Sequence, residues 1–144
     1  MPSDLVALRP GLTATGAERA LAAAEAAARE QGSRLAIAVV DGAGALLVFK
    51  RMDGTIPLSV DVSIAKAVTA ALIGTSTRTF QDMIEGGRIC LLSIRQITPV
   101  RGGLPIRAGD AVVGAIGRSR ELGEQGELAA RAGCDAITLH CDAP

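Results

Sequence analysis

The chain has 144 residues, 49% of them apolar, and its 15 basic residues balance 15 acidic ones. This length predicts one domain with one hydrophobic core, which needs neither a structural metal nor disulfides. Two Phe residues are present, with no Tyr and no Trp. Because base stacking needs aromatic faces and phosphate binding needs surplus basic charge, nucleic acid is excluded as a partner.

The N-terminus and the cysteines indicate where in the cell the protein is located. No window of about 20 apolar residues could span a bilayer, and the first residues do not have the pattern of a signal peptide. Cys90, Cys134 and Cys141 are odd in number and lack C-x-x-C spacing, so we expect reduced thiols and no zinc site. The sequence therefore predicts a cytoplasmic protein with no membrane partner and no metal.

The first half of the chain predicts a helix, a β-hairpin and a second helix. Thr13 or Thr15 is a suitable N-cap for the alanine-rich helix, and the turn residues Asp41–Gly44 join the two strands of the hairpin. Lys66 lies off the four-residue apolar stripe of the second helix, which begins with Val60 and Ile64. The expected ranges are 13–31 for the first helix, 35–40 and 45–49 for the strands, and 60–74 for the second helix.

The second half predicts a short helix, a constrained loop, another hairpin and a last helix. The apolar run Ile89–Ile94 follows the short helix and is a candidate strand, and Gly133 is expected to stop the last helix. This order favours an antiparallel sheet covered by helices, an α/β domain of the α+β type. The expected ranges are 79–85 for the short helix, 96–107 for the loop, 104–107 and 111–116 for the strands, and 121–132 for the last helix.

Three segments together resemble the GlcG/HbpS-like family of haem-degrading and haem-binding domains. They lie in order over most of the chain, and the combination is more specific than any one of them. The segments are Ala38–Gly44 (AVVDGAG); Arg51–Gly54 (RMDG) with Ser59 and Ala65–Ala67 (AKA); and Gly102–Ile106 (GGLPI) leading to Val113–Gly117 (VGAIG).

The resemblance implies one domain over residues 1–144 with a profilin-like fold, in which helices flank a central antiparallel sheet of about five strands. It also implies assembly into homo-oligomers and binding of haem or a related tetrapyrrole. Haem iron usually takes His, Cys, Met or Tyr as an axial ligand. Here the single His is His140, and Met52, Met83 and Cys90 are the other candidates, so the cofactor stays open.

Polar residues in the best-matching stretch are candidates for a small-molecule site. Arg51, Asp53 and Ser59 surround a turn and the start of a helix, where binding residues often lie. Lys66 beside apolar walls is a candidate base, because desolvation lowers the pKa of an amine. The alternative is that Lys66 pairs with an acid such as Asp53 or Asp61, or lies at a subunit interface.

The second candidate cluster follows the Gly114–Gly117 segment, where relatives usually continue with a small apolar residue, Ser and Gly. This chain has Arg118 and Arg120 instead, and two guanidinium groups there could hold a carboxylate or phosphate. Gly102 and Gly103 could add converging backbone amides. The alternative is a solvated strand end whose arginines pair with Glu121 or Glu124.

Three functions fit these residues. The first is small-ligand binding, with haem as the ligand that the family implies. The second is a cofactor-independent isomerase or lyase for a small, possibly anionic, carboxylate or phosphate substrate, in which Lys66 or Glu85 moves a proton while Arg118 and the Gly102 and Gly103 amides hold negative charge. The third is an accessory protein of a catabolic or biosynthetic operon.

Overall fold

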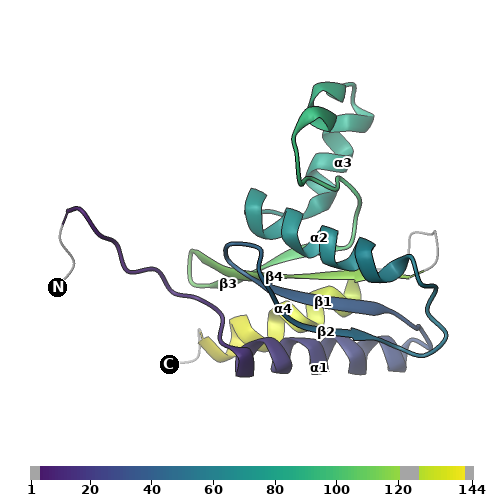
Figure 1. Cartoon of the computed structure of the whole chain (residues 1–144). Coiled ribbons are helices and arrows are strands. Elements are labelled where there is room, and N and C mark those ends of the chain that lie inside the picture. Colours follow the sequence, from purple (N-terminus) through teal and green to yellow (C-terminus); the bar gives the residue numbers. More distant parts are fainter. Residues whose placement is uncertain (1–3, 121–126, 142–144) are drawn as a thin grey trace.

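The computed structural model describes residues 4–120 and 127–141. A four-stranded antiparallel sheet has α1 and α4 on one face and α2 on the other, while α3 projects beyond α2 (Figure 1). The elements are α1 (Ala14–Glu30), β1 (Ala36–Asp41), β2 (Leu46–Arg51), α2 (Ser59–Ile73), α3 (Thr77–Glu85), the 3-10 helix η1 (Ile89–Ser93), β3 (Gly103–Ala108), β4 (Ala111–Ser119) and α4 (Leu128–Cys141).

The sheet has the strand order β2-β1-β4-β3. Both predicted hairpins are present, and β1 lies between β2 and β4. Asp41 stabilises the first turn, as its residue type indicates: its Oδ1 atom accepts hydrogen bonds from the Ala43 and Ala45 amides at 2.9 Å each. The α+β class predicted from the sequence is confirmed.

The α1 helix forms where its composition places it. The Thr13 side chain accepts a hydrogen bond from the Gly16 amide at 3.0 Å and caps the helix. Its buried side is entirely alanine, which lets the helix lie close to β1 and α4. None of the helices in the described ranges is both long and apolar enough to cross a bilayer.

The face that α2 buries is not the face that carries its stripe of large apolar residues. Its buried residues are mostly small, whereas Val60 and Ile64 are half-buried and Leu72 is exposed. A Cβ atom at Gly117 would overlap the Ser63 carbonyl and the Ala67 amide, so the backbones of α2 and β4 pack directly against each other. This close approach also brings Lys66 against the end of the sheet.

Two sequence expectations about regular elements are wrong. The run Ile89–Ile94 contains η1 and no strand, so the described sheet has four strands and not about five. In the described ranges the last helix begins at Leu128, with Glu127 in a turn before it, and the part of the expected helix over residues 121–126 lies outside those ranges. It also continues through Gly133, which is a packing residue: a Cβ atom there would lie 2.8 Å from the Ala20 carbonyl oxygen on α1.

Two segments extend from the layered body (Figure 1). The first is the N-terminal arm, residues 4–9, which precedes α1. The second consists of α3 and η1, in which Thr77 alone is buried. Arg101 fixes the base of this second segment, because its amide donates to Gln81 Oε1 at 2.9 Å.

Candidate functional site

Strand register gathers most of the candidate residues at one end of the sheet. Arg51 at the end of β2 lies opposite Ala36 at the start of β1, and Ala36 lies opposite Ser119 at the end of β4. Gly103 at the start of β3 lies opposite Gly117. The two segments that carry Lys66 and Arg118 therefore meet at this end, although they are 52 residues apart in the sequence.

Lys66 is buried at this end, with 7% of its surface exposed. Its Nζ atom donates to the Arg118 carbonyl oxygen at 3.5 Å. Burial, and then the charge of Arg118, lower the pKa of Lys66 from 10.5 to about 8. Within the described residues Lys66 has no carboxylate partner, and both Asp53 and Asp61 are exposed. The alternative of an ion pair with either acid is thus not what the structure shows.

Arg118 is 5% exposed, so the alternative of a solvated strand end is wrong for this residue. It alternates along β4 with Ile116 and therefore leaves the sheet on the face covered by α1 and α4. Its Nε atom is buried and has no hydrogen-bond partner among the described residues. Burial lowers the pKa of Arg118, while the charge of Glu127 acts in the opposite direction. The predicted partners Glu121 and Glu124 lie outside the described residues.

Gly102 lies between the Lys66 side chain and the backbone of Arg118. Gly102 has φ +122°, and a Cβ atom there would lie 2.7 Å from the Arg118 carbonyl oxygen and 3.2 Å from Lys66 Nζ. The Gly103 amide donates to Thr77 Oγ1 at 3.1 Å. The Gly103 amide, one of the two amides expected to face a ligand, is therefore already hydrogen-bonded to Thr77. No local sequence pattern links Thr77 to position 103, so its place at this site could not be predicted from the sequence.

Ser59 and Arg120 are neighbours at the same end. The Ser59 hydroxyl donates to the Arg120 carbonyl oxygen at 3.3 Å, which joins the start of α2 to the end of β4. Arg120 Nη1 donates to the Ser33 hydroxyl at 3.1 Å. Ser33 was also missed, since it precedes β1 in an ordinary turn sequence. These bonds position the backbone around Lys66 and Arg118.

The remaining candidates lie apart from this pair. Arg51 and Asp53 are exposed, and no described contact joins either to Lys66 or Arg118. Glu85 is exposed at the end of α3, where Gln81 Nε2 donates to its carboxylate at 2.8 Å. Glu85 and Lys66 are the two residues predicted from the sequence to move a proton. The structure places them apart.

The fold and this site place the protein in a class of α+β domains, here with two buried basic residues, Lys66 and Arg118, at one end of the sheet. The family model described as "Haem degrading protein HbpS-like" matches residues 12–135, and the chain belongs to this family. It is 33% identical to Protein GlcG of Escherichia coli K12 over 99 residues, which are 69% of this chain and 74% of that protein.

Two solved structures share the fold over nearly the whole chain. The Klebsiella pneumoniae protein ORFY superimposes with a TM-score of 0.86 at 28% identity, covering 96% of this chain and 98% of the other. A double mutant of Streptomyces reticuli HbpS superimposes with a TM-score of 0.85 at 30% identity, covering 95% of this chain and 94% of the other. The family resemblance inferred from the sequence motifs is confirmed.

The described residues at this site suit the carboxylates of haem and do not supply an axial ligand for its iron. Met52 is buried in the core between the sheet and α1, and burial raises the pKa of the Cys134 thiol to about 12. Cys90 is exposed on η1, and Met83 lies on the projecting α3. The side chain of His140 lies outside the described part of the chain. Lys66 and Arg118, in contrast, are charged groups that bind carboxylates.

Proposed function

We propose that this protein binds a small molecule through a carboxylate at the end of the sheet marked by Lys66, Arg118 and Gly102. The observation that carries the proposal is the buried Arg118 side chain, whose Nε atom has no hydrogen-bond partner in residues 4–120 and 127–141. Native proteins rarely leave such a group without a hydrogen bond, and a ligand is one common explanation. The family supports haem or a related tetrapyrrole, which carries two carboxylates, as the ligand class.

The electrostatics of the site favour an anion. Lys66 and Arg118 each lose hydration by burial, and the positive charge of Arg118 further disfavours a charged Lys66. An anion at this end would offset both penalties, because it interacts favourably with both cations in a poorly hydrated place. Ligand binding should therefore raise the pKa of Lys66.

Recognition through carboxylates has a consequence for the role of iron. If the two cations hold the ligand, metal-free protoporphyrin IX should bind about as tightly as haem. Binding through an axial ligand would instead require the metal. The two porphyrins therefore distinguish a carboxylate site from an iron site on the same scaffold.

The test is titration of the purified protein with haem, protoporphyrin IX and succinate, followed by absorption spectroscopy and calorimetry. We expect saturable binding of at least one of them, weakened tenfold or more by Arg118→Met. Arg88→Met is the control, because Arg88 is exposed near η1 and its loss should leave affinity unchanged. The proposal is wrong if none binds, or if Arg118→Met binds as well as the wild type.

The proton-transfer enzyme is a weaker proposal on this geometry. Lys66 has the lowered pKa that a general base needs at neutral pH. No second acid or base lies beside it in the described residues, since the contact found for the Glu85 carboxylate is with Gln81 on the same helix. We therefore assign Lys66 and Arg118 to binding.

A further inference from the structure

The N-terminal arm exposes an apolar side. Val6 is 63% exposed and Leu8 is 85% exposed, and the arm runs away from the body of the protein (Figure 1). Residues two apart in an extended segment point to the same side. Val6 and Leu8 therefore form two adjacent apolar side chains on one side of the arm, both in water in the isolated chain.

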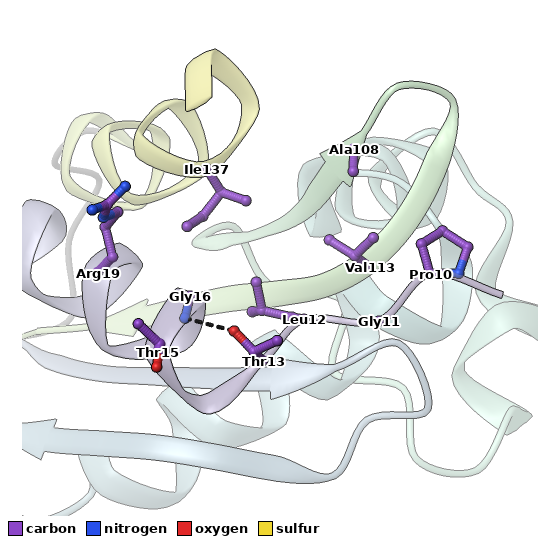
Figure 2. Close-up of a pocket in the computed structure, with 10 residues that line it drawn as sticks. All are labelled: Pro10, Gly11, Leu12, Thr13, Thr15, Gly16, Arg19, Ala108, Val113 and Ile137. Carbon is purple, nitrogen blue, oxygen red and sulfur yellow. Dashed lines mark hydrogen bonds between the residues drawn. The ribbon is translucent and has the colours of Figure 1, made fainter. Parts of the chain in front are cut away.

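An apolar pocket lies where this arm joins the body, on the face of the sheet covered by α1 and α4. Its volume is about 420 Å³, within the usual range for a binding pocket. Leu12, Val113 and Ile137 point into it, and Pro10 and Gly11 form the side from which the arm departs (Figure 2). Lys66, Gly102 and Arg118 are not among the residues that line this pocket, so it is separate from the candidate site.

We propose that two copies of this chain exchange their arms, so that Val6 and Leu8 of each copy fill the apolar pocket of the other. Each arm starts at the wall of its own pocket. If a two-fold axis relates the two copies, the arm of one copy can enter the pocket of the other, and the second arm can do the same in return. Such an interface is self-complementary and closes at two copies. The arm, residues 4–9, can span roughly 20 Å when extended.

The geometry at the base of the arm directs it outward and not back onto its own body. The Leu12 amide donates to the Val113 carbonyl oxygen at 3.0 Å, which fixes the chain at the rim of the pocket. Pro10 precedes this bond and restricts the backbone to an extended course. The 15 basic and 15 acidic residues leave no net charge to oppose association of two copies.

The first test compares self-association of the wild type with that of the Val6→Ser/Leu8→Ser double variant by sedimentation equilibrium. Both changed residues are exposed, so the variant should fold normally. We expect its dissociation constant for this interface to rise about 100-fold, as loss of two buried aliphatic side chains implies. Leu92→Ser is the control: Leu92 is 61% exposed on η1, and its loss should change the constant by less than about threefold.

The second test addresses the pocket. Ala108→Trp should fill the pocket and weaken association as the arm variant does. A synthetic peptide of residues 4–10 should compete with the arm for the pocket of the wild type. The peptide keeps the test valid if the tryptophan variant does not fold. Unchanged association of the double variant would overturn the proposal. A loss of thermal stability in the Val6→Ser/Leu8→Ser variant that does not depend on protein concentration would also overturn it. Such a loss would show that the arm occupies the pocket of its own chain.

Discussion

The ammonium group of Lys66 lies against the backbone carbonyl of Arg118 at 3.5 Å, where burial, and then the guanidinium group of the same arginine, lower its pKa. One residue thus supplies both the hydrogen-bond acceptor and the repelling charge. The carbonyl offsets only part of the cost of burying the amine, because it carries no net negative charge. The pair is therefore arranged for an anion and costs stability without one.

Replacing Arg118 should separate ligand binding from stability. Arg118→Met removes a buried charge whose Nε atom has no hydrogen-bond partner in the described part of the chain, while keeping much of its apolar volume. We expect the free energy of unfolding without ligand to stay within about 1 kcal/mol of the wild type or to rise, since burying a charge without a full set of partners is costly. Urea denaturation measures this change, and a loss of several kcal/mol would show that Arg118 is structural.

Stability should rise with pH above neutrality because of Lys66. Its pKa is about 8 in the folded protein and 10.5 ordinarily, so between these values the unfolded chain binds more protons than the folded one. The penalty is fully present below pH 8 and disappears above pH 10.5, and it is on the order of a few kcal/mol. Denaturation of the wild type and Lys66→Met at about pH 7 and about pH 10 should show this rise only in the wild type.

Gly103 should tolerate no larger side chain. A Cβ atom there would overlap the Lys66 carbonyl and lie 2.7 Å from Thr77 Cγ2. We expect Gly103→Ala to reduce the free energy of unfolding by about 3 kcal/mol, because overpacking would push α2 away from β3. Gly11→Ala is a matched control with nothing within 4 Å of the added Cβ atom, and it should be close to neutral. Equal effects of the two changes would contradict the close packing.

Gly133→Ala should destabilise the protein although alanine favours helices. At an exposed helix position this change stabilises by about 1 kcal/mol. Here the new Cβ atom would lie 2.6 Å from Ile116 Cδ1 and 2.8 Å from the Ala20 carbonyl oxygen. We expect a net loss of about 1–2 kcal/mol by thermal denaturation, whereas Asp135→Ala on the exposed side of α4 should cost little.

The sequence by itself determined the elements whose signals are local. Thr13 capped α1, Asp41 organised the first turn, and the apolar runs on either side of that turn formed β1 and β2. The order of these elements led to the α+β class, and three short motifs led to the family. Each of these signals depends on residues within a few positions of one another.

Tertiary structure decided what depends on distant contacts. Gly133 continues a helix because α1 packs against it, and Ile89–Ser93 forms a 3-10 helix and not a strand on a segment that projects from the sheet. Thr77 joined the site because it holds Gly103, 26 residues away. Burial of Lys66 and Arg118 likewise arose only when α2 packed against β4, since the cost of burying a charge is set by surroundings that the chain assembles on folding.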